Sequence, residues 1–169
     1  LDKSGNIYIA DHGNNRIQIF NNSWQYVSTI GVKKPQDVAI DASGNILVSE
    51  QNSNQIQVYN QERKRIASIK PIPIDSSEQT LQYKPSGITV DDLGNIYVTH
   101  FNQIVQIFDA HYNYVISLDT KIAGDYNVES LRDIAVDHQG KIYTSERSYA
   151  RLQVFEPLTT YRFSINPEE

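Results

Sequence analysis

Ten residues near the start of the chain, Asp2-Lys-Ser-Gly-Asn-Ile-Tyr-Ile-Ala-Asp11, set the pattern for everything that follows. The same box returns at 41–50, 91–100 and 137–146, each time with an Asp at its start and a Gly three residues later. The spacing of the copies falls in the range of about 40–50 residues that is typical of β-propeller blades. The sequence therefore predicts a repeat protein whose units stack on one another.

Two further boxes accompany these copies. One follows every copy, at 16–20, 55–59, 104–108 and 151–155, and the other precedes three of the four, at 35–40, 85–90 and 131–136. Each box alternates β-branched and aromatic residues between turn residues, which is typical of β-strands. In the second repeat we expect strands A (Val38–Ile40), B (Ile46–Ser49), C (Ile56–Tyr59) and D (Ile66–Ile69). Strand B is apolar on both faces, which predicts that each sheet lies between two neighbouring sheets.

The Asp and Gly of each box are interpreted as parts of a turn. Gly44 can adopt the left-handed backbone conformation that closes a tight hairpin between strands A and B. The carboxylate of Asp41 can accept a backbone N–H two residues further on. Both residues are required by the turn itself, so neither needs a ligand to explain it.

Residues 5–20, Gly-Asn-Ile-Tyr-Ile-Ala-Asp followed by Asn-Arg-Ile-Gln-Ile-Phe, closely resemble the NHL repeat, and the resemblance extends from residue 2 to about 165. It implies an all-β fold, a β-propeller of NHL-type four-stranded antiparallel blades. The first copy lacks strand A, and a last D strand is expected at Tyr161–Ile165. We therefore expect one domain with three complete blades plus one blade without its innermost strand, at about 1–34, 35–84, 85–130 and 131–169. The resemblance implies a larger ring of about six blades, completed by remaining blades or by another subunit.

The connections between strands predict where a partner would bind. The B-to-C and D-to-A loops share one rim, and the A-to-B and C-to-D turns share the other. The repeats differ in length chiefly in the D-to-A connections 31–37, 70–87 and 119–133. Variable loops on a rigid scaffold are typical of a binding surface. We predict a non-enzymatic binding or scaffold module that takes a protein or peptide partner on this rim.

Polar residues recur on the same rim at the ends of strands B and at the starts of strands A and C. The candidate ligand-binding set is Asp11, Arg16, Asp37, Glu50, His100, Asp133, Glu146 and Arg151. In one interpretation, Asp11, Glu50, His100 and Glu146 ring a channel mouth and hold Ca²⁺ or a cationic ligand. In the other, each residue caps the B-to-C loop of its own blade. His100 is also a candidate zinc ligand, but His12, His111 and His138 occupy other places in their repeats.

Two other functions stay open at this stage, because the family that the repeat resembles includes a peptide-amidating lyase and RNA-binding regulators. A metal-dependent lyase or hydrolase would need convergent histidines or a catalytic motif, and the sequence has no Gly-x-Ser-x-Gly, His-Glu-x-x-His or phosphate loop. An RNA-binding rim would be basic. The net charge is −5, the rim is of mixed sign, and the run Arg63–Arg65 lies in a C-to-D turn.

Composition bounds the remaining possibilities. There is no cysteine, which excludes disulfides and thiolate chemistry. No apolar run approaches the roughly 20 residues that cross a bilayer, so we expect no membrane insertion. The sequon Asn21-Asn22-Ser23 favours an extracellular or cell-surface location over the cytoplasm.

Overall fold

The computed structural model describes residues 1–73, 83–120, 131–148 and 150–156, and these form four antiparallel sheets. Blade I contains β1 (Ile7–Asp11), β2 (Arg16–Phe20) and β3 (Tyr26–Gly31), with the 3-10 turn η1 (His12–Asn14) after β1. Blade II contains β4 (Pro35–Ile40), β5 (Ile46–Glu50), β6 (Gln55–Tyr59) and β7 (Arg65–Ile69). Blade III contains β8 (Pro85–Val90), β9 (Ile96–His100), β10 (Ile104–Phe108) and β11 (Tyr114–Asp119). Blade IV contains β12 (Leu131–Val136), β13 (Ile142–Glu146) and β14 (Arg151–Phe155).

Within each blade, neighbouring strands in the chain are neighbours in the sheet. The strands predicted for the second repeat are confirmed as β4 to β7, and the four boxes beginning with Asp lie on the β4–β5 hairpin and its counterparts. The last D strand, expected at Tyr161–Ile165, lies outside the described residues. The all-β prediction is confirmed.

The A-to-B hairpin has the predicted turn chemistry. Gly44 has a φ of 81°, in the left-handed region, and its N–H donates to the Asp41 carbonyl at 2.9 Å. The Asp41 carboxylate accepts the N–H groups of Ser43 and Asn45 at 2.9 and 2.8 Å. The structural interpretation of the Asp and Gly pair is confirmed.

A tyrosine completes this turn in the other three blades, because the hydroxyls of Tyr8, Tyr97 and Tyr143 donate to the corresponding aspartates at 2.9–3.0 Å. Blade II has Leu47 at that position. Its Asp41 instead accepts from Tyr112 of blade III at 2.9 Å. The substitution therefore converts a bond within one blade into a bond between two blades.

The core lies between the blades rather than inside any one of them. Ile17 and Ile19 of blade I pack with Ile46 and Val48 of blade II. The same arrangement recurs between blades II and III and between blades III and IV. The sheets of blades II and III are hence apolar on both faces, because each of these faces packs on a neighbouring sheet.

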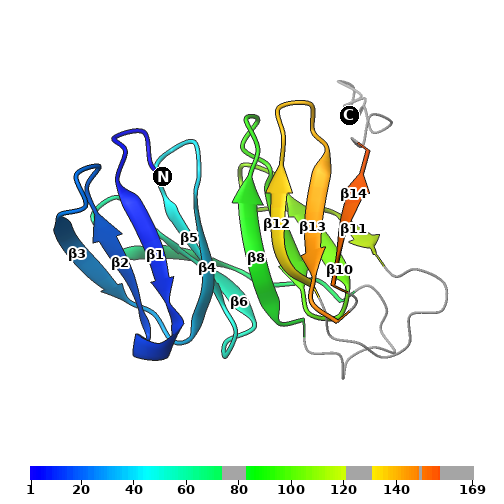
Figure 1. Ribbon diagram of the computed structural model, residues 1–169, viewed down its shortest axis with the longest axis horizontal. Helices are drawn as coiled ribbons and strands as arrows, with labels where there is room; N and C mark the ends of the chain where they lie inside the picture. The colour runs from blue at the N-terminus through cyan, green and yellow to red at the C-terminus, as the bar shows by residue number, and fades with distance from the viewer. Residues whose placement is uncertain (74–82, 121–130, 149, 157–169) are drawn as a thin grey trace, which may run out of the picture.

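The innermost strands β4, β8 and β12 lie side by side, and β1 contacts β4. In Figure 1 the hairpin turns of the blades lie along the upper edge, and η1 and the other B-to-C loops lie along the lower edge. This lower edge is the predicted binding rim. None of the described residues forms a helix with the length and hydropathy of a membrane-spanning segment.

Candidate functional site on the rim of the B-to-C and D-to-A loops

Asp11, at the end of β1, binds side chains of its own blade. Its carboxylate accepts hydrogen bonds from Arg16 Nε and Gln18 Nε2, both at 2.8 Å, and from Asn14 Nδ2 at 2.9 Å. The bond from Arg16, followed by those from Asn14 and Gln18, lowers the pKa of Asp11 to about 2. These contacts hold the β1–β2 loop closed, as a cap does.

Glu50 and Glu146 occupy the equivalent positions in blades II and IV. Glu50 accepts from the Lys33 backbone N–H and from Gln57 Nε2, both at 3.1 Å. Glu146 is buried, pairs with Arg151 Nε and accepts from Gln153 Nε2 at 3.2 Å. Each of these three acids thus binds side chains of the B-to-C loop or the C strand of its own blade, and Glu50 also binds the backbone of the D-to-A connection that precedes β4.

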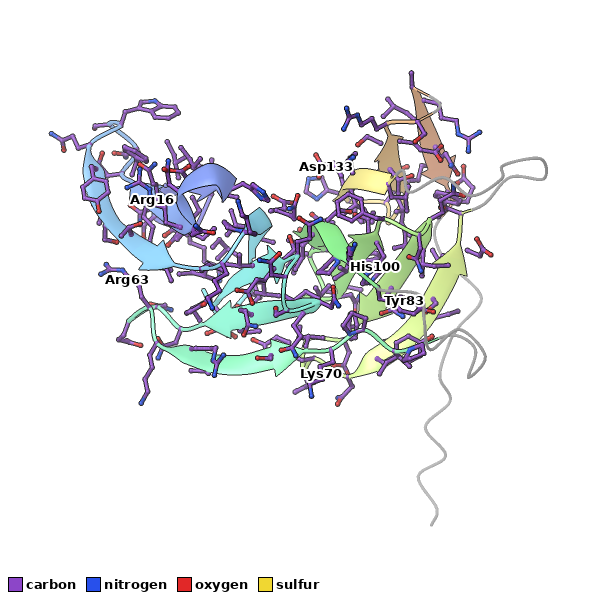
Figure 2. The ribbon with its side chains drawn as sticks, turned by 90° about the horizontal axis from the view of Figure 1, so that it is seen from below. Arg16, Arg63, Lys70, Tyr83, His100 and Asp133 are labelled. Carbon is purple, nitrogen blue, oxygen red and sulfur yellow. The ribbon has the colours of Figure 1, made fainter. Side chains whose placement is uncertain are left out.

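His100 takes the acidic position in blade III and behaves differently. Its side chain is fully buried, and its ring meets the Tyr83 ring edge-on with centroids 5.6 Å apart. Figure 2 shows the two rings next to each other beneath the rim. Burial lowers the pKa of His100 to about 3, so the ring is neutral at physiological pH. His100 was a candidate ligand at a channel mouth, but it is a core residue, because the Tyr83 ring covers it. The spacing of the repeat could not show that cover.

Because blade III has His100 where the other blades have an acid, Gln106 has no carboxylate of its own blade to bind at this position. Gln18, Gln57 and Gln153 donate to the acids of their own blades. In blade III, Gln106 binds the backbone of Ile72 on both sides, with Ile72 N–H donating to Oε1 at 3.1 Å and Nε2 donating to Ile72 O at 2.6 Å. The long connection after β7 is thereby fastened to the β10 strand of the next blade. We call this contact between Gln106 and Ile72 the clasp. The sequence analysis did not predict it, although His100, which stands where the other blades have an acid, is a signal that points to it.

Asp37 and Asp133 lie near the hub, at the starts of β4 and β12. The Asp37 carboxylate accepts from Val38 N–H at 2.8 Å and from Ile88 N–H of blade III at 2.9 Å. Burial raises the pKa of Asp37, the two N–H donors oppose that rise, and the charge of Asp133 adds to it. The negative charge of Asp133 therefore acts on Asp37 across β8. Figure 2 shows Asp133 on the open side of the arc of blades.

The candidate donors do not converge on a cation. Among the described residues, no group of three or more His, Asp or Glu side chains has the arrangement of a metal site. Asp11, Glu50 and Glu146 are each bonded to a side chain of their own blade, and His100 is buried. The set does not fit Ca²⁺ or zinc, and we derive no chemistry through a metal.

A groove lies between blades I and II and extends from this rim along β6 to Tyr59 and Arg65. It has a volume of about 610 Å³. Its lining residues are Gly31, Val32, Lys33, Glu50, Asn52, Ser53, Gln55, Gln57, Tyr59 and Arg65. Neither the Lys33 ammonium group nor the Arg65 guanidinium group has an ion-pair partner among the described residues. Glu50 is the only member of the predicted ligand set that lines the groove. The groove therefore lies between two blades and not at the predicted channel mouth.

The four antiparallel sheets stack about a common hub, which is the arrangement of blades in a β-propeller. The NHL repeat model matches residues 1–20 and 33–59, and a β-propeller repeat model matches residues 81–99. NHL repeats therefore occupy residues 1–20 and 33–59, and the chain carries propeller repeats as its sequence predicted. A comparison with curated proteins gave no significant match.

Solved propellers share the fold at low sequence identity. The WD40 β-propeller domain of Doa1 is 10% identical with a TM-score of 0.69, over 92% of this chain and 48% of that one. Catalytically inactive virginiamycin B lyase from Staphylococcus aureus, solved with quinupristin, is 15% identical with a TM-score of 0.66, over 95% and 55%. A protein of unknown function from Bacteroides caccae is 13% identical with a TM-score of 0.63, over 89% and 57%. The chain spans about half the length of these structures, and such likeness establishes the fold alone.

Proposed function

We propose that this chain is a non-catalytic binding module that receives an extended peptide segment of a partner protein in the groove between blades I and II. The observation that carries the proposal is an open, polar groove that extends from the rim of variable loops along β6, with cations that have no ion-pair partner among the described residues in Lys33 at the rim and Arg65 at the far end of β6. Amide and hydroxyl groups in its lining, from Asn52, Gln55 and Tyr59, can bind a peptide backbone.

The chain contains an example of the same recognition within itself. Gln106 holds both backbone groups of Ile72, which lies between Pro71 and Pro73 in a segment without regular secondary structure. Gln57 is the equivalent residue of blade II and lines the groove, but its amide is buried and already bonded to Glu50 and Ser68. A peptide in the groove would therefore meet the neighbouring amides of Asn52 and Gln55. Because Lys33 and Arg65 supply positive charge at the groove, the preferred peptide is acidic.

The test reverses the charge of the groove without touching its core. The double variant Lys33→Glu/Arg65→Glu and the parent chain are each used to select binders from a display library of short random peptides. We expect the parent to enrich acidic sequences and the variant to lose them. The matched control is Arg63→Glu/Lys64→Glu, which makes the same change in charge at two residues of the β6–β7 turn that do not line the groove.

The control variant should bind the selected peptides as the parent does. Equal loss of binding in both double variants would reduce the effect to net charge. Unchanged binding by Lys33→Glu/Arg65→Glu would show that the groove is not the binding surface. Circular dichroism on each variant separates a loss of binding from a loss of fold.

A further inference from the structure

A second pocket lies between blades I and II, where the turns before β1 and β5 meet the β6–β7 turn. It has a volume of about 320 Å³ and shares no lining residue with the groove. Buried Ile19 and Ile46 give it apolar walls, and exposed Lys3 and Arg63 line it at the surface. We call this site the turn pocket. Its volume is that of a site for a small ligand.

The next interface along the chain shows what fits such a space. Between blades II and III, Tyr112 of the β10–β11 turn, with a φ of 69°, packs on the core that contains Ile96. Arg63 is the equivalent residue of the β6–β7 turn, with a φ of 65°, and it is exposed. Figure 2 shows Arg63 between the strands of blades I and II. Ile46, the equivalent of Ile96, therefore lines an open pocket where the next interface holds an aromatic ring.

The two carboxylates beside the turn pocket are used by their own turns. Asp2 accepts from two backbone N–H groups, from Asn6 Nδ2 and from the Tyr8 hydroxyl, at 2.8–3.0 Å. Asp41 likewise accepts from two backbone N–H groups, one amide and one tyrosine hydroxyl. A carboxylate offers about four acceptor positions. Neither aspartate therefore has an acceptor left for a cationic ligand.

The hydrogen-bonding capacity that is left in the turn pocket belongs to donors. The Arg63 guanidinium group has no hydrogen bond or ion pair among the described residues. The Lys3 ammonium group donates to the Ala42 carbonyl at 2.9 Å and keeps further N–H groups. Burial and the bond to Asp2 raise the pKa of Tyr8 to about 12, and the positive charge of Arg63 opposes that rise. The charge of Arg63 therefore acts inside the pocket.

We propose that the turn pocket binds a small aromatic carboxylate, with its ring against Ile46 and its carboxylate at Arg63 and Lys3. The ring takes the kind of place that Tyr112 occupies one interface further on. The carboxylate receives charge-assisted hydrogen bonds, which are stronger than those between neutral groups. The inference does not depend on what the groove binds, because the two sites have no lining residue in common.

Titration with three matched probes, followed by NMR of the backbone amides, tests the ligand class. The probes are phenylacetate, phenethylamine with the opposite charge, and acetate without the ring. We expect phenylacetate to shift the signals of Ala42, Ser43 and Gly44 and to saturate at millimolar concentration, and the other two to bind about tenfold more weakly or worse. An amine that binds equally well would overturn the choice of an anion, and acetate that binds equally well would overturn the role of the ring. The site itself would be overturned by shifts confined to groove residues such as Gln55, or by no saturable shift.

Three variants test the residues that carry the site. Arg63→Gln should weaken the binding of phenylacetate about tenfold, because the charged donor is lost. Lys64→Gln makes the same change in charge in the same turn, at a residue that does not line the pocket, and should bind as the parent does. Arg63→Tyr installs the residue type of blade III, which should fill the pocket and abolish binding while circular dichroism shows an intact fold. Parent-like binding in Arg63→Gln or in Arg63→Tyr would overturn the proposal.

Discussion

One missing side chain sets the distance between blades III and IV. A Cβ atom placed on Gly87 would lie 2.7 Å from Asp133 Cα, a backbone atom that cannot rotate away. Gly87→Ala should therefore force β8 and β12 apart and lower the free energy of unfolding by about 1–3 kcal/mol. Urea denaturation measures the change. Gly13→Ala is the control, because a Cβ there meets nothing within 4 Å. Equal stability of the two variants would mean that the hub accommodates the methyl group.

Asp11 gives the fold a defined acid dependence. Because its folded pKa is about 2, below the ordinary value of 3.8, its contribution to stability is fully present above pH 3.8 and is lost as the pH falls through 2. Asp11→Asn should flatten the fall of the melting temperature over that window. Glu62→Gln, an exposed carboxylate without a hydrogen-bond partner among the described residues, should leave the profile as in the parent. A parent-like slope in Asp11→Asn would contradict the cap.

His138 makes a pH-dependent contact across the opposite rim. Its Nδ1 lies 2.6 Å from Asp92 Oδ2 of blade III, and this hydrogen bond raises the pKa of His138 above its ordinary value of 6.5. The contact stabilises the pair fully below pH 6.5 and is lost as the pH rises through the raised pKa. Titration of the His138 ring by NMR should show the raised midpoint. Asp92→Asn should return the midpoint toward 6.5, and an unmoved midpoint would show that the two turns do not meet in solution.

At the scale of the strand and its turn, the sequence was highly informative. Alternation in boxes such as Ile46–Glu50 predicted the strands, and the pairing of Asp41 with Gly44 predicted the hairpins, because both depend on residues close in the chain. The site was less predictable. The cover that Tyr83 places over His100 joins two blades across a connection of irregular length, and no local rule encodes it. The groove between blades I and II likewise depends on how two sheets diverge.

The clasp of Gln106 on Ile72 is the element-scale feature most open to test. Gln106→Ala removes both partners of the Ile72 backbone, so amide hydrogen exchange at Ile72 should accelerate markedly. The free energy of unfolding should fall by about 1–3 kcal/mol, since Ile72 N–H is left without its acceptor. Gln57→Ala changes the equivalent residue of blade II and should leave exchange at Ile72 as in the parent. Parent-like exchange in Gln106→Ala would show that the connection is held by other contacts.

For the whole molecule, stability is distributed over interfaces between blades rather than over separate cores. Blades with nearly the same sequence therefore differ in environment according to what lies beside them. Leu152 and Ile56 occupy equivalent positions in their boxes, yet one is 74% exposed and the other is fully buried. A pattern of residues predicts that a face is apolar, but it cannot tell which faces are covered. That information belongs to the assembled arc.

The energetic consequence of this difference is measurable by denaturant unfolding. Ile56→Ala should lower the free energy of unfolding by about 2–5 kcal/mol, because it leaves a cavity between blades II and III. Leu152→Ala should stay within about 0.5 kcal/mol of the parent, because its side chain is 74% exposed. Equal destabilisation by the two substitutions would show that equivalent positions of the repeat contribute equally, whatever lies beside them.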